Sequence, residues 1–339
     1  MKKFSIDLLG GLCGDPSVLC EVLNHSGSFL FDIGSTDSVS HKCLLKVRCV
    51  FISHTHIDHF IGFDRLLRVN IPHHREIFLS GPLGFRKNVQ GKLLAYTWNL
   101  LSPGQVRYRV AEVGERGRVT EYILADTNSF VPERINERSD SVVWNEGPVI
   151  VRGIPVDHGI PCIAYVLTVR GRPKVDVAKI ESLGLASGPW LGKLQLMKDI
   201  GNYGLLDIDG VSMNAEELAA EIFYNDGGRS LGYVTDLLFS KENLLKLKLG
   251  LPKVDVLVCE ASFRKIDCDR AKARGHLTTY QAALLGAYLG AEELLIFHVS
   301  NIYGGAAKES QTEAEKYFRR FSGLGNEDLQ SLIEAELAQ

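Results

Sequence analysis

Residues 54–59 form the sequence His-Thr-His-Ile-Asp-His, which follows a short apolar, β-branched run. In an extended segment the side chains at positions i and i+2 point the same way, so His54 and His56 can share one metal ion. Asp58 and His59 then fall at the start of a predicted helix, turned toward a second position. Each imidazole buried in a core needs its own hydrogen-bond partner, which makes so dense a cluster unusual for a core. The motif indicates a metal site; a surface loop with satisfied hydrogen bonds is the alternative.

The types of ligand narrow the choice of metal. Imidazole with few carboxylates and no thiolate suits Zn(II), with Fe(II) and Mn(II) as alternatives. Three further residues, His158, Asp236 and His298, each follow an apolar run at the point where a strand would end. Sites in α/β proteins are built at such strand ends. A single histidine is more often structural, so their common placement after the His-rich motif is what makes these three residues candidate ligands.

Composition excludes several other classes of protein. With 339 residues, 45% of them apolar and 23% charged, the chain is long enough for a large core and too apolar to be disordered. Its seven cysteines are scattered without a CxxC pair, which argues against a disulfide scaffold and a cysteine-only zinc ribbon. Asp7 interrupts the first apolar stretch before a signal sequence can form, so we expect a cytoplasmic location. The net charge of -3 counts against a nucleic-acid partner only as an average over the whole chain.

Strand-like and helix-like patterns both occur, which predicts helices layered on sheets. Short β-branched runs predict strands at 17–23, 28–33, 49–53, 148–156, 162–169, 231–235, 254–259 and 294–299. Helical patterns lie at 59–68, 86–97, 214–223, 279–290 and 309–321. Thr278 or Thr279 is expected to cap the fourth of these helices. Residues 170–232 are richer in Gly, Lys and Asp and are expected to form an inserted arm or loops rather than core.

The motifs and their order resemble the metallo-β-lactamase superfamily, most closely its ribonuclease Z branch. The resemblance runs from about residue 5 to residue 305 and rests on the segments FDIG at 31–34, HTHIDH at 54–59, VDHG at 156–159, TD at 235–236, CEASF at 259–263, GHLTT at 275–279 and HVSNIY at 298–303. The CEASF and HLTT segments point to the ribonuclease Z branch. The fold implied is α+β, an αββα sandwich forming a single domain over 1–339, with a substrate-binding arm inserted at 165–199.

The resemblance implies two zinc ions at one edge of the sandwich. Its ligand sets are, for the first zinc, His54, His56 and His158; for the second, Asp58, His59 and His298; and as a bridge, Asp236. Asp32 and Ser300 are candidates for orienting these ligands through hydrogen bonds. For Asp32, an ordinary aspartate in a turn at the end of a strand remains the alternative.

Counting charges in this site favours phosphate chemistry. Neutral imidazoles and two carboxylates leave two Zn(II) ions with a surplus of +2, which a bridging hydroxide reduces to +1, so an anionic phosphodiester is attracted and a nucleophile can form at neutral pH. Asp58 belongs to the catalytic set as well as to the ligands. By resemblance His276 is the proton donor to the leaving alkoxide, and Glu260 orients it or holds its proton. A buried structural acid is the alternative for Glu260.

The predicted arm resembles a tRNA-gripping element in its length and in a hairpin at Gly188-Pro189. Between residues 165 and 199 the basic side chains outnumber the acidic ones by three; the basic ones are Arg170, Arg172, Lys174, Lys179, Lys193 and Lys198. Lys and Arg on an arm would bind phosphates without reading the sequence of bases. A solvated loop with ordinary charge scatter is the alternative.

Three positions depart from the pattern of the ribonuclease Z branch, and all are expected near the substrate rather than on the metals. Cys259 stands where the family has His before the Glu of its EAS segment, and Ile302 stands where it has Arg. The loop at 14–19, GDPSVL, lacks the basic residue of the family's corresponding loop.

The sequence therefore predicts a dinuclear zinc phosphodiesterase: a ribonuclease Z-like endonuclease that cleaves precursor tRNA at its 3′ side with a metal-activated hydroxide. The alternatives are a general or cyclic-nucleotide phosphodiesterase, another hydrolase of this fold that acts on a thioester, lactam or sulfate ester, and a non-hydrolytic iron or metal-binding protein. The partners expected are RNA or a small phosphodiester and a second copy of the chain, with no membrane.

Overall fold

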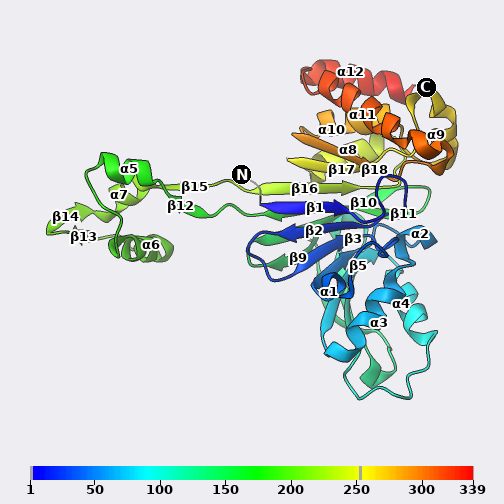
Figure 1. Ribbon diagram of the computed structural model, residues 1–339, viewed down its shortest axis with the longest axis horizontal. Coiled ribbons are helices and arrows are strands. Elements are labelled where there is room, and N and C mark those ends of the chain that lie inside the picture. Colours follow the sequence, from blue (N-terminus) through cyan, green and yellow to red (C-terminus); the bar gives the residue numbers. More distant parts are fainter. Residues whose placement is uncertain (1–2, 252–253, 339) are drawn as a thin grey trace. The chain divides into compact units, whose positions relative to one another are not determined.

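The structure is a computed structural model that describes residues 3–251 and 254–338. The chain divides into two compact units, Met1–Val169 with Arg229–Gln339, and Arg170–Gly228. The larger unit contains two sheets and the helices that cover them (Figure 1). No helix in the described ranges is long and apolar enough to cross a membrane.

The first sheet is built by the N-terminal part of the chain, with its strands side by side in chain order. Its strands are β1 (Phe4–Leu8), β2 (Val18–Val22), β3 (Ser28–Phe31), β4 (Val47–Phe51), β5 (Glu76–Pro82), β6 (Arg107–Val113), β7 (Val119–Ala125) and β8 (Glu133–Arg138). The central pairs from β3 to β6 are parallel, and the pairs at both ends are antiparallel. Strand β4 is therefore an internal strand, with β3 and β5 as its neighbours. Its carboxyl end directly precedes the His-rich motif.

The second sheet has the order β18-β17-β16-β11-β10-β9. Its strands are β9 (Val142–Glu146), β10 (Val149–Asp157), β11 (Pro161–Val169), β16 (Arg229–Val234), β17 (Val256–Glu260) and β18 (Glu293–Phe297). Strands β16, β17 and β18 are parallel, with Val234 opposite Cys259 and Glu260 opposite Phe297. This register brings the residues that follow the three strands to the same edge of the sheet.

Aromatic side chains fill the space between the two sheets. Phe31 and Phe51 come from the first sheet and Tyr165 and Tyr233 from the second, and all four are fully buried. The ring of Phe31 lies 5.3 Å from that of Tyr233, and the ring of Phe51 lies 5.4 Å from that of Tyr165. Such pairs contribute about 0.5–1.5 kcal/mol each beyond the area that they bury, and they fix one sheet against the other.

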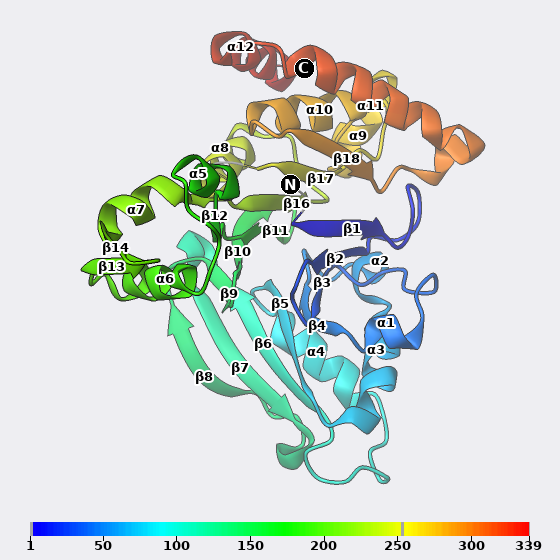
Figure 2. The ribbon, with the colours of Figure 1, turned by 60° about the vertical axis from the view of Figure 1, so that its left-hand side comes forward.

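Helices cover the outer face of each sheet, which completes the predicted αββα sandwich (Figure 2). On the first sheet lie α1 (His41–Leu44), α3 (Phe63–Asn70) and α4 (Phe85–Leu94). On the second lie α8 (Lys241–Gly250), α10 (Thr279–Tyr288), α11 (Ala307–Phe321) and α12 (Asn326–Leu337). Two short helices, α2 (Ile57–Phe60) and α9 (Cys268–Arg274), carry or precede predicted site residues.

The smaller unit has a core of its own, which corrects the expectation of an arm without one. It consists of α5 (Val177–Ser182), α6 (Trp190–Ile200), α7 (Ala215–Ile222) and the strand pairs β12 (Pro173–Val175) with β15 (Phe223–Asn225) and β13 (Leu205–Ile208) with β14 (Val211–Asn214). Ile180, Trp190, Leu194 and Ile222 pack together in its interior. The bounds also differ from the predicted 165–199, because residues 165–169 complete β11 and the unit continues to Gly228. Gly188-Pro189 leads into α6 and forms no hairpin.

The eight predicted strands are present with shifted ends, but the predicted helix at 59–68 is divided. Gly62 separates α2 from α3, and its N–H donates a hydrogen bond to the carbonyl of Ile33 at 2.7 Å. A Cβ at Gly62 would lie 2.7 Å from the carbonyl oxygen of Gly34. The two backbone segments therefore pack directly against each other, and this tertiary contact interrupts the helix.

Gly34 is required by the same close approach, because a Cβ there would lie 1.9 Å from the carbonyl oxygen of Asp58. We expect Gly34→Ala to lower the free energy of unfolding by about 1–3 kcal/mol, the usual cost of overpacking, and to displace the His-rich motif. Gly91→Ala is the matched control, since its Cβ would meet no atom within 4 Å in α4, and alanine in a helix interior should raise stability by about 0.5–1 kcal/mol. Urea unfolding measures both, and equal stability of the two variants would contradict the contact.

Candidate metal centre

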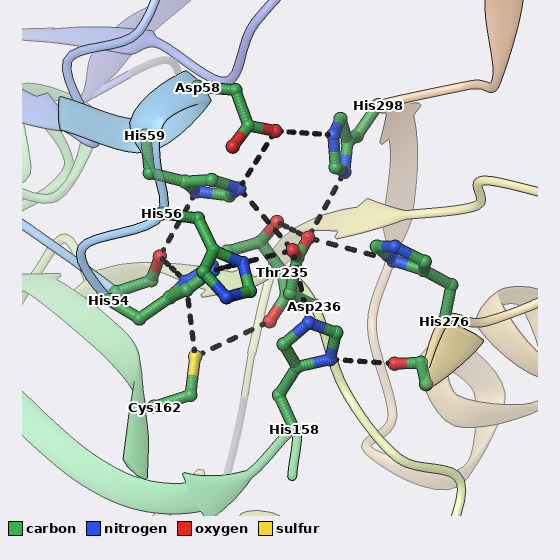
Figure 3. Close-up of polar contacts among 12 residues, drawn as sticks. His54, His56, Asp58, His59, His158, Cys162, Thr235, Asp236, His276 and His298 are labelled. Carbon is green, nitrogen blue, oxygen red and sulfur yellow. Dashed lines mark hydrogen bonds and ion pairs between the residues drawn. The ribbon is translucent and has the colours of Figure 1, made fainter. Parts of the chain in front are cut away.

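Seven predicted ligands from four separate segments lie together at one edge of the sandwich (Figure 3). The His-rich motif follows β4, and the other ligands follow strands of the second sheet: His158 after β10, Asp236 after β16 and His298 after β18. Their convergence follows from the parallel register described above, which aligns the carboxyl ends of neighbouring strands.

The first group of ligand atoms consists of His54, His56, His158 and Asp236, all within 4.8 Å of one another. The Nε2 atoms of His54 and His158 each lie 3.5 Å from Oδ2 of Asp236. Nε2 of His54 and Nδ1 of His56 are 2.8 Å apart. Three imidazoles and one carboxylate thus face a common point, as a tetrahedral zinc site requires.

The second group consists of Asp58, His59 and His298. Oδ2 of Asp58 lies 3.7 Å from Nε2 of His59 and 3.5 Å from Nε2 of His298. Asp236 also reaches this group, with Oδ2 at 3.4 Å from Nε2 of His59 and Oδ1 at 3.0 Å from Nδ1 of His298. Asp236 therefore contacts both groups, which is the position of a bridging ligand.

Contacts at Nδ1 orient three histidines so that their Nε2 atoms face the proposed metal positions. Nδ1 of His59 donates to Oδ2 of Asp32 at 2.7 Å, and Nδ1 of His158 donates to the carbonyl of Gly275 at 2.8 Å. Nδ1 of His54 lies 3.0 Å from the hydroxyl of Ser53, which itself donates to Asp32. Such bonds fix the tautomer and turn a lone pair toward the metal.

Two buried nitrogens also fit a bound cation. Nε2 of His59 and Nδ1 of His298 are buried and lack a well-directed hydrogen bond among the described residues, although oxygens of Asp236 lie 3.4 and 3.0 Å from them. Burial, together with the neighbouring histidines, lowers the pKa of His54 to about 2, so this imidazole is neutral and able to act as a ligand. Burial opposes ionisation of Asp58, but the hydrogen bond and charges of His298 and His59 lower its pKa to about 2. The donor set is therefore that of a divalent metal site.

Protons balance the carboxylates when no metal is bound. Burial opposes protonation of His298, yet its hydrogen bonds to Asp236 and Asp58 raise its pKa to about 10. Burial likewise opposes protonation of His59, and Asp32 and Asp236 raise its pKa well above the usual value. Binding of a cation to these nitrogens must displace both protons.

Asp32 supports the ligands from beneath. Its carboxylate is fully buried and accepts hydrogen bonds from the N–H and hydroxyl of Ser53, from His59, and from the hydroxyl of Tyr233 at 2.7 Å. It orients His59 directly, as the resemblance implies, and joins the aromatic core to the site. Sequence reasoning missed Ser53 and Tyr233, although Ser53 stands directly before the His-rich motif.

The backbone is strained at three site residues, Asp32, Asp236 and His298, whose φ angles are +53°, +43° and +56°. Left-handed backbone is unfavourable for residues other than glycine and persists where the surrounding structure enforces it, often at functional sites. At each position the turn directs a side chain from the end of a strand into the site.

A third group places His276 and Glu260 beside Asp236 and His298. Nδ1 of His276 donates to Oε2 of Glu260 at 2.9 Å and lies 3.8 Å from Asp236. Glu260 is fully buried and also accepts from the N–H of Leu237 and the hydroxyl of Ser262. Burial opposes protonation of His276, but Glu260, helped by Asp236, raises its pKa. This imidazole is thus held in one orientation and favoured in its charged form.

Ser300 does not make the ligand-orienting hydrogen bond predicted for it. Its hydroxyl accepts a hydrogen bond from the N–H of Ile302 and caps the short helix η5 (Asn301–Ala306). The ligand-orienting contacts among the described residues come instead from Asp32, Ser53 and Gly275. The predicted substrate residues Arg170, Arg172, Lys174, Gly188, Pro189 and Lys193 all belong to the smaller unit.

The fold is that of the metallo-β-lactamase class, and the site lies at one edge of its sandwich. The structure is similar to the metallo-beta-lactamase fold protein YhfI of Bacillus subtilis, with a TM-score of 0.53 and 14% identity over 94% of each chain. It is also similar to the short form of human tRNase Z, with a TM-score of 0.50 and 16% identity over 89% of this chain and 92% of the other. No protein-family model matches the chain.

Curated relatives give the particular family. Ribonuclease Z of Deinococcus radiodurans is 32% identical over 256 residues, which cover 75% of this chain and 76% of the relative. Ribonuclease BN of Escherichia coli is 29% identical over 82% of this chain and 80% of the relative. The chain belongs to the ribonuclease Z family, and it is a hydrolytic enzyme of the endoribonuclease and phosphodiesterase class with a divalent metal centre.

Metal uptake should release protons, because His298 and His59 are protonated in the metal-free protein. Below pH 10 the raised pKa keeps the proton on His298, so zinc affinity should rise as the pH is increased from 7 toward 10. Titration calorimetry of the metal-free protein with Zn²⁺, in buffers of different ionisation enthalpy at pH 8, measures the protons released.

His298→Ala should release about one proton fewer, whereas His73→Ala, at an exposed histidine outside the site, should release the same number as the parent protein. Heats that are independent of the buffer would contradict this protonation of the metal-free site.

Proposed function

We propose that the protein is a dinuclear zinc phosphodiesterase and a ribonuclease Z-like endonuclease that cleaves precursor tRNA at its 3′ side. The observation that supports this most is the pairing of two ligand groups, joined at Asp236, with an acid made by His276 and Glu260. Membership of the ribonuclease Z family, and the names of its relatives, support tRNA as the substrate.

His54, His56 and His158 would hold one zinc ion, Asp58, His59 and His298 the other, and Asp236 would bridge them. The predominance of imidazole and the lack of thiolate ligands favour zinc over Mn(II) or Fe(II). When bound, the two cations would attract the phosphodiester, stabilise charge in the transition state and lower the pKa of a water molecule that serves as the nucleophile.

His276 would donate a proton to the oxygen that leaves phosphorus. Its Nδ1 is held by Glu260, so Nε2 is the nitrogen that can meet the substrate. The raised pKa of His276 favours its protonated form, which general-acid catalysis requires. Glu260 acts as its orienting residue, and Asp58 keeps its negative charge among the ligands.

The smaller unit would bind RNA through its basic side chains. Arg170, Arg172, Lys179 and Lys193 are exposed. Lys174 lies 3.5 Å from Asp226, and the ammonium of Lys198 lies 4.6 Å from the ring of Phe223, so part of the positive charge is used within the unit. Gly188 and Pro189 lead into α6, whose second turn begins near Lys193. Exposed Arg and Lys neutralise phosphates whatever the sequence of bases.

A smaller phosphodiester, including a cyclic nucleotide, is the second candidate substrate. The cavity beside the ligands Asp58 and His298 has a volume of about 280 Å³, and Gly14, Asp15 and Ile302 contribute to its lining. Ile302 and the 14–19 loop are two of the positions where the family's basic residues are replaced. This cavity therefore offers a long RNA strand few cations at those two places.

We further propose a cytoplasmic homodimer. The apolar side chains of Ile57 and Ile61 in and after α2 are 76% and 47% exposed, which supports a protein contact at this face.

Incubation of the zinc-loaded protein with a 3′-extended precursor tRNA and with bis-p-nitrophenyl phosphate tests the proposed substrate. We expect one cut at the 3′ side of the tRNA, located by mapping both product ends. Hydrolysis of the small ester without cleavage of the RNA would favour the second candidate.

His276→Ala should lower kcat by about 10²–10⁴-fold, the usual contribution of general acid–base catalysis, while metal content stays the same. Glu260→Gln should lower the pKa of His276, because the hydrogen bond and charge of Glu260 raise it in the parent protein. The high-pH limb of the rate profile should then move to lower pH. Loss of metal from His276→Ala, measured by plasma emission, would show that His276 is a ligand.

A further inference from the structure

His276 contributes to the walls of two cavities. The first is the cavity beside the metal ligands Asp58 and His298. The second, which we name the α12 cavity, has a volume of about 240 Å³ and is lined by Leu238, Phe239, Glu336 and Leu337, together with Ser240 and Lys272. The α12 cavity contains none of the seven metal ligands, and the proposed function does not use it.

The last turn of α12 is attached to the segment that carries His276. Gln281 completes a capping box at the start of α10, where its side-chain oxygen accepts from the N–H of Thr278 at 3.0 Å. The amide nitrogen of the same side chain donates to Oε1 of Glu336 at 3.0 Å. Thr278 lies two residues after His276. The two hydrogen bonds of Gln281 therefore hold Glu336, in the wall of the α12 cavity, in a fixed position relative to the imidazole of His276.

The chemistry of the walls fits a flat aromatic ligand with N–H groups at its edge. Phe239 is half-buried and offers a ring, and Leu238 and Leu337 add apolar surface. Oε1 of Glu336 accepts from Gln281, and a carboxylate has further lone pairs that can accept from amino and imino groups of bases. Glu336 is only 8% exposed, and together with Asp269 it gives the lining two carboxylates against the one ammonium of Lys272, which disfavours a phosphate at this place. Single-stranded RNA is commonly bound in this way, by stacking and by hydrogen bonds to base edges.

We propose that the α12 cavity binds the nucleobase of the nucleoside whose oxygen is protonated by His276. This inference rests on the proposed function. The metal ligands lie in the first cavity, so the phosphate belongs there, and the leaving oxygen passes His276 toward the second. A base held on Phe239 positions that oxygen against the imidazole, which makes Phe239 and Glu336 positioning residues. The chain would then distinguish an RNA with a base at this place from one without it.

The test uses the zinc-loaded full-length protein and 3′-extended precursor tRNA with an abasic nucleotide on one or the other side of the mapped cut. We call the leaving side the side of the cut whose nucleoside carries the oxygen that leaves phosphorus. In the parent protein, removal of the base on the leaving side should lower kcat/KM about tenfold or more, the effect of one lost base–aromatic stack. Removal of the base on the other side should change it much less. Phe239→Ala should cleave the intact RNA and the RNA lacking the leaving-side base at similar rates.

Glu336→Gln keeps an oxygen that can accept from Gln281 and removes the charge. It should reduce the ratio of kcat/KM for the intact RNA to kcat/KM for the RNA that lacks the leaving-side base. Glu334→Gln on the exposed face of α12 is the matched control and should keep the parent ratio. Circular dichroism and thermal unfolding confirm that each variant is folded.

Equal cleavage of the intact and leaving-side abasic RNAs by the parent protein, or an undiminished ratio in Phe239→Ala, would overturn the assignment of the cavity. Failure of the parent protein to cleave intact RNA while it hydrolyses bis-p-nitrophenyl phosphate would instead overturn the proposed function, and this inference with it.

Discussion

The carboxylate of Asp236 is the interaction on which the rest of the site depends. It is 2% exposed, and nitrogens of four histidines lie 3.0 to 3.5 Å from its oxygens. A buried anion is costly unless positive charge surrounds it. In the metal-free protein that charge comes from the protons of His59 and His298, whose pKa values are raised. The same geometry suits replacement of these protons by divalent metal, so one buried carboxylate links protonation to metal binding.

The fold supplies this arrangement through the parallel strands β16, β17 and β18. Their register aligns three strand ends, from which Asp236, Glu260 and His298 project. Asp32 joins the two sheets at the same place, since it accepts from Tyr233 on one sheet and from Ser53 and His59 after the other. The left-handed backbone of Asp32, Asp236 and His298 is tolerated because the paired strands and the aromatic core hold it.

Most of the site could be predicted from the sequence because its residues lie in short contiguous motifs, whereas much of the fold could not. Strand β8 has no buried side chain, so hydrophobicity gives no trace of it. Strand β5 ends in Gly81 and Pro82, and both residue types are unfavourable within strands. The short apolar run before them is therefore not recognisable as a strand from the sequence. The break at Gly62 and the core of the smaller unit depend on tertiary contacts. The contact between Gln281 and Glu336 joins residues 55 positions apart, and the capping box that contains Gln281 gives no sign of Glu336.

Chemistry and substrate recognition are built on different parts of the molecule. Glu260 accepts hydrogen bonds from Leu237, Ser262 and His276 at once, so the proposed proton donor His276 is held as firmly as the sheet from which Glu260 comes. The departures at Ile302 and in the 14–19 loop line the neighbouring cavity without being ligands. Recognition can therefore change while the metal centre is kept, because substitutions there leave the buried charges and their hydrogen bonds intact. An overall charge of -3 is consistent with the proposed nuclease, because the positive charge that meets the phosphate would come from bound cations and a local set of basic side chains.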